Sequence, residues 1–298
     1  MSFSTPIALF IYKRKETTLR VLERISELKP VQLFIIADGP KNSSELKIIN
    51  SIKNEVESMI NWNCDIRRIY AKTNYGLAKR VSSGLSKAFQ SVDRLIVLED
   101  DTLPQISFFH FCDELLEKYK DDDRVGHISG CNHHEYDDKN SYNFSSVANI
   151  WGWATWKRAW LHFDLNMPTW REKNKKVFMK HWIKERFHRN GMIKMFDLHC
   201  MNNDPWAWSY QWLYALYSNN LLSIVPNKNL VSNIGIGPDA TNTIRNITIE
   251  DYPPIKSYMK FPLKHPTLMR NIAFEKYYYN KSEPSFIRRI KNSIKSIF

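Results

Sequence analysis

Short apolar runs alternate with amphipathic segments through the first hundred residues, and this alternation is the strongest constraint on the fold. The runs at 6–12, 31–37 and 94–98 are continuous and apolar, which is typical of buried strands. The segments between them repeat apolar residues at helical spacing. Strands that alternate with such helices predict an α/β fold with a mostly parallel central sheet flanked by helices. Helices are expected at 16–28, behind a capping pair of Asn42 and Glu45, at 76–89 and at 106–119, with further strands at 66–70, 125–129 and 224–225.

Polar and charged residues follow three of the predicted strands. Tyr12-Lys13-Arg14 ends the first, Asp38-Gly39 ends the second, and Glu99-Asp100-Asp101 ends the strand at 94–98. Ligands bind outside the carboxyl ends of strands in open α/β sheets. We therefore expect these three groups to converge on one ligand-binding crevice.

The acidic triplet 99–101 indicates a metal site. Three neighbouring carboxylates repel one another, and burial raises their pKa values. A divalent cation removes this repulsion, and Mg²⁺ or Mn²⁺ typically binds one or two carboxylates together with substrate phosphates. The alternative for an isolated triplet is a solvated acidic turn, but its place directly after a buried strand favours the metal.

The composition limits the classes of ligand that the chain is expected to bind. Lys and Arg outnumber Asp and Glu by 43 to 31, so the net charge of +12 favours nucleic acid, anionic lipid or phosphorylated small molecules. The basic residues are spread along the chain, and neither an RNP-like strand nor a zinc finger is recognisable, which argues against nucleic acid. The four cysteines form no CxxC pair, so we expect free thiols in a reducing cytoplasm.

Seven short motifs occur in order over residues 5–245, and together they carry a resemblance to a known family. The chain resembles a bacterial family of GT-A fold glycosyltransferases with a DXD-type motif, sugar transferases related to animal N-acetylglucosaminyltransferases. The motifs are FIYKR (10–14), IADGPKN (36–42), NYGLAKRVSSG (74–84), VLEDD (97–101), ISG (128–130), WGWATWKRAW (151–160) and NLVSNIGIGPDATNT (229–243).

The resemblance implies a division of the chain and a reaction. A GT-A-type domain would span 1–245, with a nucleotide-binding half at 1–102 and an acceptor half at 103–245, followed by a C-terminal extension at 246–298. The activity implied is inverting, metal-dependent transfer of a hexose or N-acetylhexosamine from a nucleotide-sugar donor, expected to be UDP-linked. The acceptor implied is a cell-surface polysaccharide or a lipid-linked glycan.

The resemblance also implies roles for single residues. Asp101 would contact the metal, Mn²⁺ or Mg²⁺, and Asp100 the ribose or the metal shell, with Glu99 in support. Trp153, with Trp151, would border the donor sugar, whereas Trp156, Trp160, Trp170 and Trp182 are expected in the core. Tyr12 and Arg14 would lie beside the nucleotide, and Asp38 would accept a hydrogen bond from the base. Asn74 and Arg80 would lie near the ribose and diphosphate. The alternative for Arg80 is a position on a solvated helix face.

Two positions that are expected near the reacting groups depart from the family pattern. The acid that accepts the acceptor's proton often follows a Trp in relatives, as in WDYQW, but this chain has Ser209 there. Asp204 is the nearest acid and is our candidate base. Asn242 stands where relatives often have His. These departures leave open a catalytically weak or non-enzymatic protein that binds nucleotide or sugar at a membrane.

The C-terminal segment 286–298 is a basic amphipathic sequence. Four apolar residues would share one helical face, and Arg and Lys occupy the rest. This pattern is typical of a helix that lies on an anionic membrane surface, although packing back onto the domain is the alternative. The apolar run at 6–12 is too short for a signal peptide, so we expect a cytoplasmic protein, peripheral on the inner face of the cell membrane.

A nucleotidyltransferase is a further alternative, because such enzymes can share this order of strands. They usually carry a Gly-rich loop after the first strand, whereas this chain has IYKRKE at 11–16. The sequence therefore favours sugar transfer over nucleotidyl transfer.

Overall fold

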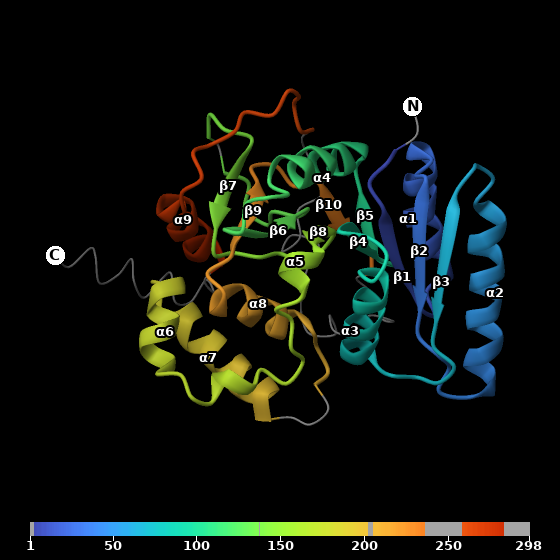
Figure 1. Cartoon of the computed structure of the whole chain (residues 1–298), viewed down its shortest axis with the longest axis horizontal. Coiled ribbons are helices and arrows are strands. Elements are labelled where there is room, and N and C mark those ends of the chain that lie inside the picture. Colours follow the sequence, from blue (N-terminus) through green and yellow to red (C-terminus); the bar gives the residue numbers. More distant parts are fainter. Residues whose placement is uncertain (1–2, 137, 202–204, 236–257, 283–298) are drawn as a thin grey trace.

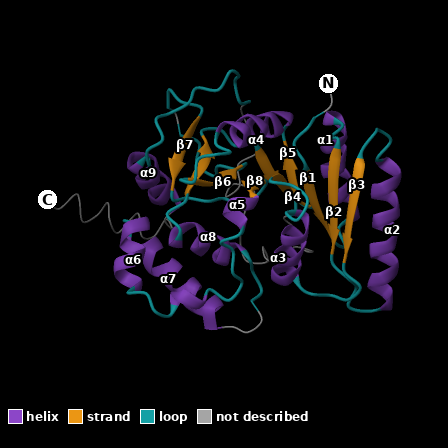
Figure 2. Ribbon diagram, viewed as in Figure 1, coloured by secondary structure: helices purple, strands orange, loops and turns teal. Residues whose placement is uncertain are grey.

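The computed structural model describes residues 3–136, 138–201, 205–235 and 258–282. These residues form a mixed α/β fold in which a large sheet is flanked by helices (Figures 1 and 2). The expected fold class is confirmed. The proposed division at residue 102 stays a prediction, although one sheet contains strands from both sides of that residue.

The main sheet has the strand order β3-β2-β1-β4-β8-β6-β9-β7 in the described part of the chain. Its first half is parallel, as the sequence predicts, but β8 runs antiparallel to both β4 and β6, and β7 antiparallel to β9. A small antiparallel ribbon joins β5 to β10. The strands are β1 Ile7–Ile11, β2 Gln32–Ala37, β3 Asp65–Tyr70, β4 Arg94–Glu99, β5 Thr102–Pro104, β6 Val125–Ser129, β7 Tyr142–Ser145, β8 Trp153–Trp156, β9 Leu222–Pro226 and β10 Val231–Asn233.

Alternate residues of the parallel strands bury opposite faces of the sheet. In β1, Ile7 and Leu9 pack with α1, α2 and α4, whereas Ala8 and Phe10 pack with α3 and α8. A third apolar cluster joins α6, α7 and α9, and Figure 1 places α6 and α7 beside α8. The helices are α1 Lys15–Leu28, α2 Ser43–Met59, α3 Leu77–Ala88, α4 Ile106–Lys118, α5 Lys157–Trp160, α6 Lys175–Trp182, α7 Arg186–Met201, α8 Ser209–Ser218 and α9 Ile272–Ser282, with a 3-10 turn at Pro168–Trp170.

Most tryptophans of the 151–212 block belong to the interior. Trp156, Trp160, Trp170 and Trp182 are each at most 4% exposed, as expected. The segment Trp153–Trp156 forms β8, a strand in the middle of the sheet that the sequence analysis did not anticipate. Among the described residues, no helix combines the length and apolar character that crossing a bilayer requires.

Candidate functional site

Three polar segments meet where the parallel strands end. β1 lies between β2 and β4, and all three run in the same direction, with Ile11 opposite Ala37 and Phe10 opposite Glu99. The segments that follow these strands are therefore neighbours, as the sequence predicts. We call the residues gathered here the strand-end cluster: Tyr12, Arg14, Asp38, Asn74, Glu99, Asp100 and Asp101.

Asp38 fixes the loop that leads into α3. Its carboxylate accepts hydrogen bonds from the backbone N–H groups of Gly39, Tyr75 and Gly76 at 2.8–3.0 Å, and from the amide of Asn74 at 3.0 Å. These four donors use the acceptor capacity of a carboxylate. In this structure, Asp38 therefore orients the loop at 74–76.

Asn74 ties this loop to the first strand. Its amide nitrogen also donates to the backbone carbonyl of Gly39 and lies 3.0 Å from the hydroxyl oxygen of Tyr12. Gly76 caps α3 with a φ of +77°, a conformation that L side chains rarely adopt. The position of the loop thus depends on a carboxylate, an amide and a glycine from separate parts of the chain.

Glu45, in the first turn of α2, holds the segment after β1. Its carboxylate accepts hydrogen bonds from the Tyr12 hydroxyl, the Lys13 ammonium and the Lys41 backbone N–H, each at 2.7–2.8 Å. The bond from Lys13 contributes most to lowering the pKa of Glu45 to about 2. Burial is the main cause that raises the pKa of Tyr12 above its ordinary value, and Glu45 adds to it.

The Asn42–Glu45 pair caps α2 as predicted. The Asn42 side chain accepts a hydrogen bond from the Glu45 backbone N–H at 2.9 Å. The Glu45 carboxylate binds the three donors from residues 12, 13 and 41 instead of completing a reciprocal box. Sequence reasoning assigned Glu45 only to this cap and missed its link to Tyr12, which lies 33 residues away.

The acidic triplet is mostly buried, and its carboxylates repel one another. Burial first, and then repulsion from Asp101, raise the pKa of Glu99 to about 8 and that of Asp100 to about 7. Arg14 lowers both pKa values in turn. Its guanidinium lies 2.5 Å from a carboxylate oxygen of Asp101 and 3.7 Å from one of Asp100. Arg14 thus supplies part of the positive charge that the acids require.

The β5–β10 ribbon packs directly on this triplet. The backbone N–H of Ile234 donates to the carbonyl of Asp101 at 2.8 Å. A Cβ on Gly235 would lie 2.5 Å from an Asp101 carboxylate oxygen and 2.8 Å from the Arg14 guanidinium. A residue with a side chain therefore does not fit at position 235 without moving the ion pair. Gly235 lies inside the motif at 229–243, but the sequence analysis gave it no role.

Arg80 projects from α3 and is buried, with 6% of the residue exposed. The alternative of a solvated helix face is therefore wrong. Its Nε has no hydrogen-bond partner in the described part of the chain, and its guanidinium carbon lies 5.9 Å from the centre of the Tyr75 ring. Burial lowers the pKa of Arg80, and the nearby Asp38 opposes that shift. A buried guanidinium with an unused donor fits an anionic ligand.

Trp153 is not brought to the strand-end cluster. Its side chain is 0% exposed and stacks on Trp208, with 5.3 Å between ring centres. Trp151 is partly exposed instead and lines a hollow of about 260 Å³ with Ser209, Tyr210 and other residues. We call this the Ser209 hollow.

Trp151, which lines the Ser209 hollow, precedes β8, and β8 lies next to β4, the strand that ends in the acidic triplet. Val97 pairs with Trp153 in antiparallel register, so the residues before Trp153 lie beside those after Val97. A Cβ on Gly152 would lie 3.3 Å from the Leu98 side chain, the residue that precedes Glu99. The candidate base Asp204 and Asn242 lie outside the described residues, as does the basic tail.

A buried histidine that the sequence analysis missed connects β6 to α8. The indole N–H of Trp212 donates to Nδ1 of His127 at 3.1 Å, so Nε2 carries the proton and donates to the Asn149 carbonyl at 3.0 Å. Burial lowers the pKa of His127 to about 4. The neutral ring thereby holds α8 against the sheet.

The strand-end cluster suits a metal only together with a ligand. No three side chains among His, Cys, Asp and Glu in the described residues are arranged to hold a metal ion by themselves. A magnesium-type ion commonly takes one or two carboxylates and completes its shell with substrate phosphates and water. Asp101 and Asp100, with their buried and mutually repelling charges, fit such a shared site.

Neither a family model nor a curated protein matches the chain. Solved structures with distant similarity include a mannosyltransferase from Pyrobaculum calidifontis in complex with GDP-Man and Mn²⁺. It is 11% identical over 72% of this chain and 69% of its own, with a TM-score of 0.42. TarS 1–349 from S. aureus is 9% identical over 78% and 59%, also with a TM-score of 0.42. Similarities this distant establish neither a family nor an activity for this chain.

Proposed function

We propose that the chain is a glycosyltransferase that uses a nucleotide-sugar donor, UDP-linked, and a divalent cation, Mn²⁺ or Mg²⁺. The observation that carries the proposal is the acidic triplet at the end of β4, in which burial and then repulsion from Asp101 raise the pKa values of Glu99 and Asp100. Carboxylates in this state favour a bound cation, because a cation stabilises their charged form. A cation shared with a diphosphate would satisfy both partners.

The rest of the strand-end cluster supports a nucleotide diphosphate as the ligand. Arg80 offers a buried Nε donor that has no partner among the described residues, and Arg14 lies against Asp101. Tyr12 and Asn74 are held in place by Glu45 and Asp38. We propose that Tyr12 and Asn74 border the nucleoside, that Asp38 positions the loop that faces the base, and that both arginines meet the phosphates.

The proposed reaction uses the strand-end cluster for the donor and the Ser209 hollow for the acceptor. The acceptor hydroxyl would lie in the Ser209 hollow and attack the anomeric carbon from the face opposite the diphosphate, with inversion. A carboxylate must take the hydroxyl proton as the new C–O bond forms and the bond to the diphosphate breaks. Asp204 is our candidate for this base. A metal held by Asp101 would neutralise charge on the departing diphosphate.

The position of Ser209 supports a second candidate function, a protein that binds a nucleotide-sugar without transferring it. Ser209 begins α8 and lines the hollow where an acid is expected. A hydroxyl without an adjacent base is a poor proton acceptor at neutral pH. Hydrolysis or transfer of a bound donor separates the two functions, because the second predicts binding alone.

We further propose that the acceptor is a cell-surface polysaccharide or a lipid-linked glycan, reached by a protein that lies on the inner face of the membrane. This part depends on the basic tail, and deletion of residues 284–298 should release the protein from anionic liposomes. Unchanged liposome binding after the deletion would refute the membrane association.

The experiment for the main proposal is a panel of UDP-, GDP- and dTDP-sugars scored by thermal shift with Mn²⁺ and with EDTA. A bound donor stabilises the folded state by RT ln(1 + [L]/Kd), about 2.7 kcal/mol at a hundredfold excess over Kd. We expect at least one donor to raise Tm with Mn²⁺ and none with EDTA. The absence of any stabilisation across the panel would refute the proposal.

A further inference from the structure

The outward sides of α6 and α7 combine positive charge with exposed apolar side chains. The stretch 175–201 contains seven basic residues and two acidic ones. Met179 and Trp182 of α6 and Phe196 of α7 are buried in one apolar cluster, so the other sides of both helices face away from the protein interior. Figure 1 places these two helices at the opposite end of the molecule from α2.

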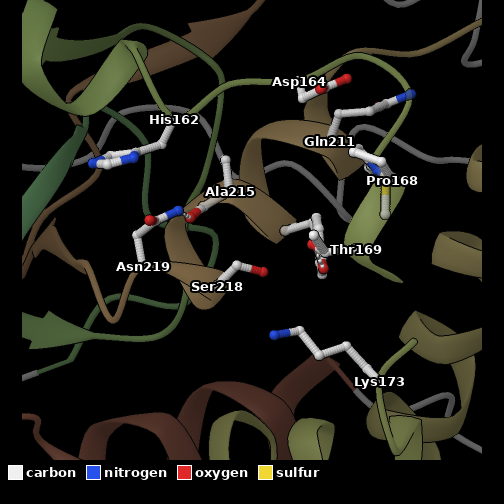
Figure 3. Close-up of a pocket in the computed structure, with 11 residues that line it drawn as sticks. His162, Asp164, Pro168, Thr169, Lys173, Gln211, Ala215, Ser218 and Asn219 are labelled. Atoms are coloured by element: carbon white, nitrogen blue, oxygen red, sulfur yellow. Dashed lines mark hydrogen bonds between the residues drawn. The ribbon is translucent and has the colours of Figure 1, made fainter. Parts of the chain in front are cut away.

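The cations of this region divide into two groups. Lys173 points into the pocket between α8 and the segment at 162–173 (Figure 3), and Lys175 pairs with Asp197 at 2.6 Å. The later cations are exposed and form no ion pair with any described residue: Lys176, Lys180, Lys184, Arg186 and Lys194. The outward sides of α6 and α7 therefore attract an anionic partner.

Exposed apolar side chains lie among these cations. Val177 on α6 is 66% exposed, and Phe187 and Leu198 on α7 are 46% and 50% exposed. Phe187, Lys194 and Leu198 share one side of α7, because spacings of seven and four residues are close to whole helical turns. We call the unpaired cations together with Val177, Phe187 and Leu198 the α6–α7 face.

This combination matches the surface of an anionic lipid membrane. Cations on a helix meet the headgroups, while apolar side chains on the same helix enter the boundary with the acyl chains. A nucleic acid would contact the cations through its phosphates and would leave Val177 and Leu198 in water. Exposed apolar residues alone are not enough: α2 exposes Leu46 and Ile48, but it contains three Glu and two Lys.

We infer that the α6–α7 face binds an anionic membrane. This contact belongs to the folded part of the chain and is distinct from the basic tail at 286–298. Stable attachment of a peripheral protein commonly takes two membrane signals. The tail would supply one of them, and the α6–α7 face supplies the other.

The Ser209 hollow lies on another side of α7. Met192 lines that hollow and is five residues after Phe187, which is about 140° around the helix. A membrane against the α6–α7 face would therefore lie about one helix diameter, ~10 Å, from the hollow. This placement would bring a lipid-linked acceptor to the hollow, and that role rests on the proposed function.

Sedimentation of the full chain with vesicles tests the inference, using phosphatidylcholine with and without about one third phosphatidylglycerol. We expect the anionic vesicles to bind at least tenfold more tightly than the neutral ones. Lys176→Gln, Lys180→Gln and Lys194→Gln together should weaken that binding about a hundredfold, because each cation at the surface contributes about a factor of five. Phe187→Ser combined with Leu198→Ser should weaken it at least tenfold.

Matched controls lie on or beside α1 and α2, at the other end of the molecule (Figure 1). Arg20→Gln, Lys29→Gln and Lys47→Gln together remove the same charge from exposed positions. Leu46→Ser combined with Ile48→Ser removes two exposed apolar side chains. Because charges act on a membrane only within a screening length of ~10 Å at 0.1 M salt, both controls should change vesicle binding less than twofold.

Four results would overturn the inference. The first is equal binding of neutral and anionic vesicles by the full chain. The second is unchanged binding by both α6–α7 variants, and the third is an equal loss in the controls. The fourth is binding of a single-stranded oligonucleotide without binding of vesicles, which would assign the cations to a nucleic acid. Unfolding curves check that each variant folds, and the charge and apolar variants keep the test decisive independently of each other.

Titration with UDP and Mn²⁺ separates this inference from the proposed function. The α6–α7 variants should bind UDP as wild type does, because none of the substituted residues belongs to the strand-end cluster. Vesicle binding that the variants lose, in a protein that binds no UDP, would refute the proposed function alone. UDP binding together with vesicle binding that the variants leave unchanged would refute the membrane face alone.

Discussion

Gly235→Ala tests whether the β5–β10 ribbon positions the Arg14–Asp101 pair. A methyl group at 235 would lie 2.5 Å from an Asp101 carboxylate oxygen, 2.6 Å from the Asp101 Cβ and 2.8 Å from the Arg14 guanidinium. Ordinary contacts begin at 3.4 Å, so a side chain or the ribbon must move by ~1 Å. Overpacking of this kind costs about 1–3 kcal/mol.

The overpacking cost is present in the free and in the bound protein, so affinity falls only as far as the displaced Asp101 carboxylate loses its contact with the cation. Because 1.4 kcal/mol corresponds to a factor of ten, a loss of that order predicts about tenfold weaker binding of UDP with Mn²⁺ by Gly235→Ala. Isothermal titration of the full chain measures this change. Because the substitution displaces Asp101, the gain in UDP affinity on adding Mn²⁺ should also become smaller.

Gly191→Ala is the matched control for this substitution. A Cβ there meets nothing within 4 Å, and the residue lies inside α7. Alanine should stabilise that helix by up to about 1 kcal/mol and leave the affinity for UDP unchanged. Affinity equal to wild type in Gly235→Ala would refute the reasoning, as would an equal loss in both variants.

Two further predictions concern the residues that hold the site in place. Asp38→Asn replaces an acceptor oxygen with an amide donor that faces backbone N–H groups. The backbone amides of Tyr75 and Gly76 should therefore exchange faster with deuterium. Unchanged protection of these amides would contradict the role of Asp38. His127 binds its proton at a pKa of about 4 in the folded state against 6.5 ordinarily, so the unfolded state takes up more protons as pH falls from 6.5 towards 4, and stability is lost in that window. Between pH 7 and 5 the free energy of unfolding should fall by about 2 kcal/mol because of His127. Urea unfolding of His127→Gln should show a fall that is smaller by this amount than in wild type. Parallel pH profiles of the two proteins would contradict the assignment.

The parallel half of the sheet could be predicted because its strands are continuous apolar runs. β1, β2 and β4 are buried on both faces, so their sequences carry a strong signal, and their order along the chain placed the polar segments at one edge. β8 was missed because its Trp-rich sequence suggested sugar contacts. The Trp153 ring fills the space between the sheet and α8 instead, and the Trp156 ring packs on the opposite face against α4.

The sequence predicted that the segments after β1, β2 and β4 meet, but it did not predict the contacts that hold them together. The triplet at 99–101 and the residues after β1 and β2 converge as expected. The contacts that fix them, such as Glu45 with Tyr12 and Gly235 with Asp101, join residues that lie far apart in sequence.

The central claim is that Asp101 holds a cation together with a diphosphate. Anomalous diffraction from crystals of the full chain soaked with UDP and Mn²⁺ tests it most directly. We expect one manganese peak in contact with both the Asp101 carboxylate and the diphosphate oxygens. A nucleotide bound without a peak there, or a peak elsewhere while Arg14 remains paired with Asp101, would contradict the claim.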